Sequence, residues 1–475
     1  MRFFWLGFIA SIAFFSNAFA EDLAEVYQLA VANDQLFQNA TATRQATAEN
    51  LPQAIAALLP NINGIISSQM NRTWTTNANP NFATNGLVKY NSRGYELNLS
   101  MPIIDFNQWY QVSAAKAAVK AADANYAAAA QDLIIRTVTA YFNVLEAEDN
   151  LDNAHAQATL LSRQFTEAKA RFSVGVDAIT SVYNVQANYA TAVAQEIAAK
   201  NNLYAAYQNL QVITKDPINR LSKLKNNLPL IKPTPDNFLA WQKSAESHNF
   251  SLLALRYQAA AARTTISANR ANHLPVLSTV NSYSYSHESP NDAEPSGLQQ
   301  KDSTLGLQLS VPLFSGGAVN SQTRQAQDLY VEALTNLEQQ HRQITAQVFQ
   351  NYSAIIAGIS KIKADEAAVL AAESALKSNQ AAYQVGTMTI VDVLTSLHNL
   401  YQAKQNLAAD KYSYLINTLN LKRLAGNLSN LDILALNHDL DKTHTLPMNT
   451  LNSNNKQDLN LNDLNNDLND PSLIK

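Results

Sequence analysis

An internal duplication constrains the fold of this chain more than any other feature. A glycine separates two helical stretches in RFSVGVDAIT, at Gly175, and again in YQVGTMTIVDVL, at Gly386, 211 positions later. Upstream, Pro102 in LSMPIIDF and Pro312 in LSVPLFSG are 210 positions apart. Each copy is predicted to contain a helix, a pair of short strands and two very long helices. The chain should therefore fold as two similar halves.

Long segments without helix-breaking residues follow the strands in both copies. Between Ile103 and Asp216 there is no proline and the only glycine is Gly175. Between Ala318 and Ala425 there is again no proline, and the glycines are Gly358 and Gly386. Helices of this kind greatly exceed the globular average, and one from residue 103 to 172 would be on the order of 100 Å long.

The apolar positions within these helices recur every three or four residues. This spacing predicts a coiled-coil seam, which in the first copy comprises Leu151, Ala154, Ala158, Leu161, Phe165, Ala168 and Phe172. Much of the remaining helix surface is Gln, Asn, Ser and Thr. A narrow apolar seam with a broad polar remainder suits a hollow assembly wetted on one or both faces. A plain two-stranded coiled coil is the alternative on the helices alone.

The segments before the long helices alternate with a period of two. Apolar Tyr95, Leu97, Leu99 and Met101 alternate with polar residues, as do the apolar positions from Leu305 to Leu313. Residues 61–74 and 276–287 are the expected partner strands, with loops at 75–92 and 288–301. The strands have the 9 to 11 residues that cross a bilayer obliquely. A half-exposed soluble hairpin is the less specific interpretation.

The number of strands then predicts oligomerisation. Four strands cannot close a barrel, and an open edge in lipid would leave backbone groups without hydrogen bonds. Eight strands from two chains enclose an interior filled by side chains, whereas twelve from three chains can leave a lumen. A trimeric pore is thus the smallest useful solution, although a tetramer also satisfies this argument.

The N-terminal twenty residues are typical of an export signal. Arg2 precedes an apolar run from Phe3 to Phe15, and Ala18-Phe19-Ala20 forms a small-x-small cleavage pattern. An uncleaved membrane anchor is the alternative, but the run is shorter than a spanning helix requires. The 475 residues include no cysteine, and the net charge of −4 gives no indication of nucleic-acid binding.

The sequence predicts neither an enzyme nor a cofactor or metal site. The eight histidines are scattered without metal-ligand spacing, and no nucleophile elbow or glycine-rich phosphate loop occurs. A pore, an adaptor without a pore, and an envelope-spanning structural tether are the function classes that remain. The alternating, duplicated strands favour the pore.

With these features in place, the chain resembles the TolC family of trimeric outer-membrane efflux and secretion channels. The resemblance covers residues 23–436 and is most specific in RFSVGVDAIT, YQVGTMTIVDVL, LPVLSTVNSYSY, LQLSVPLFSGG and YSYLINTLNLKRLAGNL. It implies a mainly α-helical homotrimer that forms a twelve-stranded β-barrel in the outer membrane lipid and a twelve-helix tunnel across the periplasm. It also implies two partners, a periplasmic adaptor protein and an inner-membrane transporter.

The same resemblance implies roles for residues at the two helix turns. The adaptor-docking positions are Val174, Gly175 and Val176 in the first copy and Val385, Gly386 and Thr387 in the second. Asp392 matches one gate aspartate, while Thr395 occupies the second aspartate position, so that ring is missing. Tyr383 matches the family's linking tyrosine, but Met388 and Ser181 replace its arginine and aspartate. We therefore expect packing and weak hydrogen bonds to hold the gate closed, with Asp177 adding charge nearby.

The chain is expected to divide into five parts. They are a signal peptide (1–20), a first repeat (21–215), a linker (216–236), a second repeat (237–436) and a low-complexity tail (437–475). The proline-rich linker is expected to pack around the waist of the tunnel. The tail is expected to be largely disordered, although its recurring leucines could instead form a small helix.

Overall fold

The computed structural model describes residues 21–75, 86–218, 220–225, 227–291 and 296–441. The expectations about the export signal, and those about the tail beyond residue 441, lie outside this range. The chain divides into two compact units, each made of segments distant in sequence. The strand unit comprises residues 39–128 and 246–344, and the hairpin unit comprises the described residues before 39, between 129 and 245, and from 345 onward.

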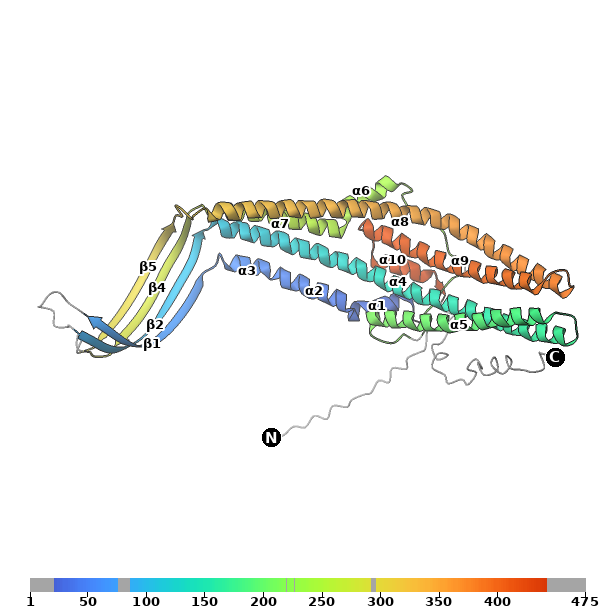
Figure 1. Cartoon of the computed structure of the whole chain (residues 1–475). Coiled ribbons are helices and arrows are strands. Elements are labelled where there is room, and N and C mark those ends of the chain that lie inside the picture. Colours follow the sequence, from blue (N-terminus) through green and yellow to red (C-terminus); the bar gives the residue numbers. More distant parts are fainter. Residues whose placement is uncertain (1–20, 76–85, 219, 226, 292–295, 442–475) are drawn as a thin grey trace, which may run out of the picture. The chain divides into compact units, whose positions relative to one another are not determined.

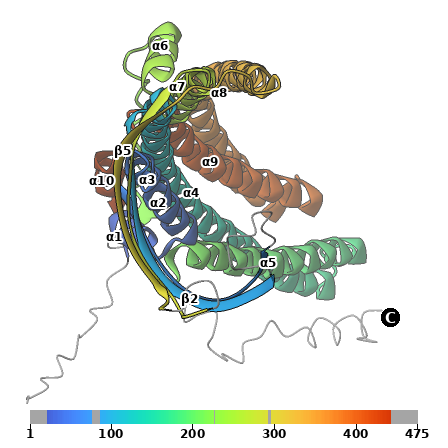
Figure 2. The same cartoon turned by 90° about the vertical axis from the view of Figure 1, so that its left-hand side faces the viewer.

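A four-stranded antiparallel sheet forms the end of the strand unit (Figure 1). Its order is β1 (Asn61–Thr75), β2 (Gly86–Ile104), β4 (Val276–Glu288) and β5 (Leu298–Ser310), so the β2–β4 pairing joins the two copies. Figure 2 shows β2 and β5 following a pronounced curve. The loops at residues 75–92 and 288–301 were predicted too long, because β2 and β5 begin at residues 86 and 298. The predicted alternation to Leu313 also overshoots β5, which ends at Ser310.

The register confirms the predicted alternation. Tyr95 lies opposite Ile66 on β1 and opposite Tyr285 on β4, so these side chains share one face. The Tyr95 and Tyr285 rings stack with centroids 5.4 Å apart. On the opposite face, Asn98 lies between Asn63 and Ser282. One face is thus mainly apolar and the other mainly polar.

Within the strand unit, helices adjoin the end of the sheet at which β1 begins and β2 ends. They are α3 (Asn50–Ala56), α7 (Phe250–Ala271), most of α2 (Gln35–Ala48), and the first parts of α4 (Phe106–Ser173) and α8 (Ala318–Gln384). The Arg44 Nε atom lies 2.6 Å from an Asp123 carboxylate oxygen, and the guanidinium lies over the Tyr126 ring. This contact holds α2 against α4.

The hairpin unit contains two long helical hairpins. The second parts of α4 and α8 are followed by α5 (Ile179–Thr214) and α9 (Ile390–Leu424). α4 and α8 have 68 and 67 residues, and α5 and α9 have 36 and 35. These matching lengths reflect the duplication. Among the described residues, no helix is both long and apolar enough to cross a membrane.

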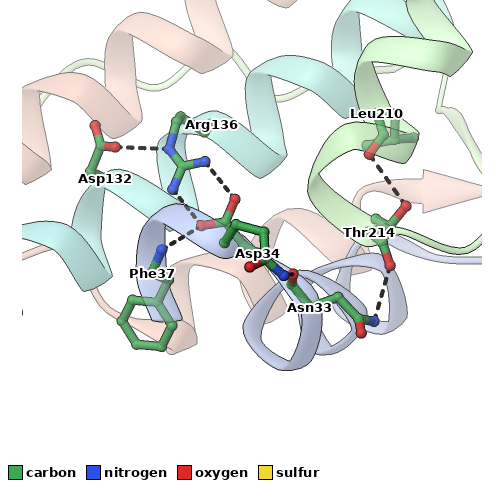
Figure 3. A network of polar contacts seen from close by, with 8 residues as sticks. Asn33, Asp34, Phe37, Asp132, Arg136, Leu210 and Thr214 are labelled. Carbon is green, nitrogen blue, oxygen red and sulfur yellow. Dashed lines mark hydrogen bonds and ion pairs between the residues drawn. The ribbon is translucent and has the colours of Figure 1, made fainter. Parts of the chain in front are cut away.

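Short elements lie beside the hairpins, near the C-terminal ends of α5 and α9. They are α1 (Leu23–Asn33), β3 (Lys223–Leu224), α6 (Phe238–His248), α10 (Asn430–His438) and β6 (Leu440–Asp441), with β3 paired to β6. Figure 3 shows how α1 is attached: the Arg136 guanidinium donates to both Asp34 carboxylate oxygens, at 2.8 and 2.9 Å. These bonds hold the pKa of Asp34 below its usual value. Asn33 donates to the Thr214 carbonyl, which adds α5 to the network.

Candidate functional site

The first hairpin reverses direction through a Schellman turn. Gly175 has a φ of +75°, a conformation that favours glycine. Its N–H donates to the Phe172 carbonyl, and the Val176 N–H donates to the Arg171 carbonyl, both at 2.9 Å. These two bonds satisfy carbonyl groups that the end of α4 would otherwise leave without partners.

The second hairpin repeats this turn bond for bond. Gly386 has a φ of +78°, its N–H donates to the Tyr383 carbonyl at 3.0 Å, and the Thr387 N–H donates to the Ala382 carbonyl at 2.9 Å. Added Cβ atoms at Gly175 and Gly386 would meet nothing within 4 Å. Glycine is thus required at both turns by backbone conformation and not by crowding.

The turns expose apolar side chains at the end of the hairpins. Val174, Val176 and Val385 are 73%, 62% and 75% exposed. Met388 is 43% exposed. Exposed branched side chains beside a rigid turn can pack against the helices of another protein. The structure thus presents the predicted docking positions on the surface.

The two hairpins differ at the start of their second helices. Thr389 caps α9, and the Asp392 carboxylate accepts from the Thr389 hydroxyl at 2.7 Å and from its N–H at 3.0 Å. This is a capping box, and its hydrogen bonds lower the pKa of Asp392. The corresponding residue before α5 is Ala178, which has no side chain able to cap. Asp392 is therefore an ionised carboxylate with a structural partner.

A polar contact joins the two hairpins beside the turns. The Tyr383 hydroxyl donates to the Asp177 carboxylate at 2.6 Å, and the Arg171 Nε donates to the same oxygen at 2.8 Å. The Arg171 guanidinium also lies over the Tyr383 ring, 4.9 Å from its centroid. We call Arg171, Asp177 and Tyr383 the tip link.

The tip link is charge-assisted. The hydrogen bond from Arg171 lowers the pKa of Asp177, and the bond from Tyr383 acts in the same direction. Burial together with Asp177 raises the pKa of Tyr383 to about 12. At neutral pH the tyrosine is therefore a neutral donor and the aspartate an anionic acceptor, and such bonds are stronger than neutral ones.

Arg171 was not among the predicted gate residues, and Asp177 was expected only to add charge nearby. Weak hydrogen bonds were expected because Ser181 and Met388 replace charged residues, but Asp177 provides a carboxylate four positions before Ser181. The detectable signal was an arginine and an aspartate on either side of a glycine turn. Thr395 takes no part in the link, since its hydroxyl donates to the Val391 carbonyl within α9.

A packed apolar core lies next to the turns, between the two hairpins. Tyr383 is 9% exposed and belongs to a cluster from both hairpins that includes Phe165, Val182, Ile390 and Leu397. All the predicted seam residues from Ala154 to Ala168 are buried. The tip link therefore lies at the margin of an apolar interface, where partial burial strengthens its electrostatic contacts.

A polar groove of about 960 Å³ lies farther along the hairpin unit, between α4, α5 and α9. Most of its polar lining consists of neutral amides: Asn143, Asn150, Gln157, Gln195, Asn202, Asn209, Gln402 and Gln405. Arg136 and Glu146 are the ionisable groups of the lining besides His398 and Tyr401. A surface of neutral donors and acceptors wets readily and has no strong preference for charge.

Comparison with known proteins identifies the family. The family model described as outer membrane efflux protein matches residues 26–214 and 241–427. This chain belongs to the outer membrane efflux protein family. Outer membrane protein TolC of Vibrio cholerae serotype O1 is 35% identical over 426 residues, which cover 90% of this chain and 95% of that protein. TolC of Escherichia coli K12 is 38% identical over 440 residues, covering 90% and 87%.

A solved structure shows the same fold at lower identity. The Campylobacter jejuni CmeC outer membrane channel superposes with a TM-score of 0.72 at 19% identity, covering 89% of this chain and 90% of that one. The predicted TolC-family membership and fold class are therefore confirmed.

Family membership also decides between the function classes left by the sequence. This efflux protein is an outer-membrane exit duct for efflux or type I secretion, with a periplasmic extension. The adaptor without a pore and the structural tether are set aside. The matched relatives also include the alkaline protease secretion protein AprF of Pseudomonas aeruginosa, 29% identical over 424 residues, which cover 88% of this chain and 87% of that protein. Relatives that are channel and secretion proteins support a non-enzymatic role.

Proposed function

We propose that three chains form one closed channel. Among the described strands, β1 and β5 are the edges of a four-stranded sheet, and such edges cannot remain unpaired in lipid. Three sheets close a twelve-stranded barrel, and three pairs of hairpins form the twelve-helix tunnel. In this assembly the repeats extend over residues 21–215 and 237–436, joined by the linker 216–236.

The channel is closed at the helix turns, and the tip link holds it closed. The observation that carries this proposal is the bond from Tyr383 to Asp177, because it connects the second hairpin to the first. Breaking it would free the hairpins to move apart. In the trimer, Asp392 would place three carboxylates around the axis, while Thr395 adds no second ring.

The exposed valines of the turns form the docking surface for a periplasmic adaptor. Val174, Val176 and Val385, with the glycines and Thr387 between them, present an apolar edge to a partner's helical hairpin. The adaptor would connect the duct to an inner-membrane transporter. Transport energy then comes from the transporter, since the duct itself is passive.

The amide-lined groove would form part of the tunnel wall. Its neutral polar lining suits a conduit that passes varied cargo without binding it tightly. Because the chain contains no cysteine, a single Asn202→Cys variant can be labelled selectively. A charged thiol reagent should reduce the conductance of this variant and leave the wild type unchanged. Full labelling without any change in conductance would show that the groove does not line the lumen.

Single-channel conductance of the purified trimer in a planar bilayer tests the proposed function. The wild type should insert and conduct weakly, and Asp177→Asn should conduct more because the link loses its anionic acceptor. Asp328→Asn is the matched control, since Asp328 lies in the strand unit on the surface of α8. A trimer that inserts but never conducts, even as the Asp177→Asn, Tyr383→Phe double variant, would refute the proposal.

A further inference from the structure

The charged side chains of the four strands are sorted by sign between the two faces of the sheet. Directly opposed residues share a face, so the register assigns each side chain. Lys89 opposes Arg72, Arg93 opposes His287, and Tyr285 opposes both Tyr95 and Lys301. These side chains all lie on the face of Tyr95. Within the described strands, that face carries cationic or imidazole groups and no carboxylate: Arg72, Lys89, Arg93, His287 and Lys301.

The carboxylates of the strands lie on the other face. Glu96 and Asp302 are in one row, since both oppose Ser284. Glu288 opposes Ser92, which shares the parity of Glu96. This face is otherwise rich in Asn, Ser, Thr and Gln. Such segregation is not needed for a sheet wetted equally on both sides, where opposite charges can pair across strands.

The cationic face is also the apolar face. Ile66, Leu305 and Leu307 are 90%, 86% and 69% exposed in the single chain. Their exposure, in a protein of the outer membrane, identifies this face as the one that contacts lipid. The cations are therefore on the lipid side of the strands, and the carboxylates are on the side that would line the lumen.

Most of the aliphatic residues of this face lie on one side of the tyrosines, and most of its cations lie level with them or on the other side. From the α4 end of β2 toward its turn, the residues on this face are Met101, Leu99, Leu97, Tyr95, Asn91, Lys89 and Leu87, with Arg93 between Tyr95 and Asn91. Aliphatic residues come first and tyrosines follow. Arg93 and Lys89 lie beyond the tyrosines, in the part of the strand away from the helices (Figure 1), and share it with the apolar residues Met70, Trp74 and Leu87. Tyr95, Tyr283 and Tyr285 cluster at the boundary. Tyrosines at such a boundary mark the interface between hydrocarbon and headgroups.

The cations are placed where they repel one another. Arg72 and Lys89 are directly opposed on neighbouring strands, and like charges in this arrangement destabilise a sheet. No carboxylate on that face of the described strands offsets the repulsion. A layer of anions beyond the tyrosines would remove this cost. A guanidinium binds phosphate well because its donors match two phosphate oxygens.

We propose that this face binds the phosphate groups of anionic lipids in the leaflet at the turn end of the barrel. The proposal rests on the strands crossing the outer membrane, as in the proposed function. The tyrosines fix the depth of the barrel, and Arg72, Lys89, Arg93 and Lys301 contact the headgroup phosphates. With three chains, the four cations become a ring of twelve. The ring would orient the barrel and hold a shell of anionic lipid around it.

Lipid titration of the detergent-solubilised, full-length protein, followed by native mass spectrometry, tests this proposal. Phosphatidylglycerol is compared with zwitterionic phosphatidylcholine, and soluble glycerol 3-phosphate provides the free-anion comparison. The test variant combines Arg72→Gln, Lys89→Gln, Arg93→Gln and Lys301→Gln. The matched control combines Arg163→Gln, Arg324→Gln, Lys363→Gln and Lys377→Gln, which remove the same charges from exposed positions on the long helices.

The wild type and the control should prefer phosphatidylglycerol. The preference of the test variant should be smaller by at least about tenfold, since each surface cation contributes roughly fivefold to the affinity for anionic lipid. An undiminished preference in the test variant, or none in the wild type, would overturn the proposal. Equal competition by glycerol 3-phosphate would also overturn it, by showing a site for free anions. Conductance in phosphatidylcholine bilayers separates the lipid-binding proposal from the proposed channel function, because the test variant should still conduct there.

Discussion

At the scale of single residues, the closed tip depends on the Asp177 carboxylate. One of its oxygens accepts from both Arg171 and Tyr383, so a single side chain connects the turn of one hairpin to the helix of the other. Asp177 is kept ionised by these donors and is 14% exposed at its side chain. An acceptor held in this way makes a stronger link than two neutral groups would.

Removal of the Tyr383 hydroxyl should therefore loosen the tip. Tyr383→Phe keeps the buried ring and the contact with Arg171 but loses a hydrogen bond to a charged group, which contributes about 1.5–3 kcal/mol. We expect higher conductance and a larger open fraction in planar bilayers. Tyr183→Phe is the matched control, because Tyr183 is exposed on α5, in the first hairpin of the same hairpin unit.

A double-mutant cycle separates the link from general loosening. Tyr383→Phe and Asp177→Asn remove the two ends of one bond, so their effects on the open fraction should be less than additive. Fully additive effects, or a Tyr383→Phe channel that conducts like the wild type, would show that the bond does not hold the tip closed.

A second residue-level prediction concerns Glu148, a buried carboxyl on α4. It is 4% exposed, one of its oxygens has no hydrogen-bond partner, and the other accepts from the Tyr207 hydroxyl at 2.6 Å. Burial raises its pKa from 4.5 to about 7, although Tyr207 and Lys223 oppose the shift. The other titratable groups close to it are Asp149, Asp152, Tyr141 and Tyr412.

The direction of the pH effect follows from this raised pKa. Between pH 4.5 and about 7 the folded protein keeps the Glu148 proton and the unfolded chain does not, so the free energy of unfolding falls as the pH rises. The loss is complete above pH 7 and is on the order of 3 kcal/mol. Glu148→Gln should remove this share of the slope in urea unfolding followed by circular dichroism. Burial also raises the pKa of Asp149, and this residue keeps its own contribution to the slope in the variant. Identical slopes for both proteins would contradict the assignment.

At the scale of elements, the two glycine turns are conformational requirements. Gly175→Ala places a side chain at a φ of +75° and should cost about 1 kcal/mol, with no steric clash to obscure the effect. Hydrogen exchange of the amides at 172–176 should accelerate about fivefold, which corresponds to that free energy.

Gly358→Ala provides a control of opposite sign. Gly358 lies inside α8, and its added Cβ would meet Tyr414 atoms at an ordinary 3.8 Å. Alanine is the better helix former by about 1 kcal/mol, so this variant should be slightly more stable and leave exchange at the turn unchanged. Faster exchange at the turn in both variants would show that the effect is not specific to positive φ.

The elements themselves could be predicted from periodicity, but the contacts of the site could not. Long intervals without glycine or proline gave α4, α5, α8 and α9 to within a few residues, and alternation gave the four strands. The loops were predicted too long because polar residues such as Asn91 and Gln299 occur in strands as well. Arg171 and Asp177 flank one glycine turn, but their role was missed because it depends on Tyr383 of the other hairpin, and no local pattern places that tyrosine beside them.

At the scale of the whole molecule, the duplication does not extend to the chemistry of the tip. Both hairpins share the Schellman turn, yet Thr389 and Asp392 form a capping box in the second copy where Ala178 caps nothing in the first. Arg171 and Asp177 come from the first copy and Tyr383 from the second. Six nearly equivalent hairpins in a trimer would therefore carry features that repeat three times.

This threefold chemistry predicts a cation-sensitive constriction formed by Asp392. Three ionised carboxylates around one axis attract multivalent cations, because their fields add in a narrow passage. Asp392→Asn removes the charge and keeps an oxygen that can still accept from Thr389, so the cap is retained. We expect block by a trivalent cation added from the tip side to weaken by about tenfold or more in planar bilayers.

Two comparisons make this prediction specific to the position of Asp392. Thr389→Ala breaks the cap but keeps the carboxylate, so it should destabilise the start of α9 by about 1 kcal/mol while cation block persists. Asp177→Asn removes a carboxylate that Arg171 already neutralises, and should therefore weaken block less than Asp392→Asn. Equal block in the wild type and Asp392→Asn would exclude Asp392 from the constriction. Loss of block in Thr389→Ala alone would instead assign the effect to the fold of the tip, since that variant leaves every carboxylate of the ring in place.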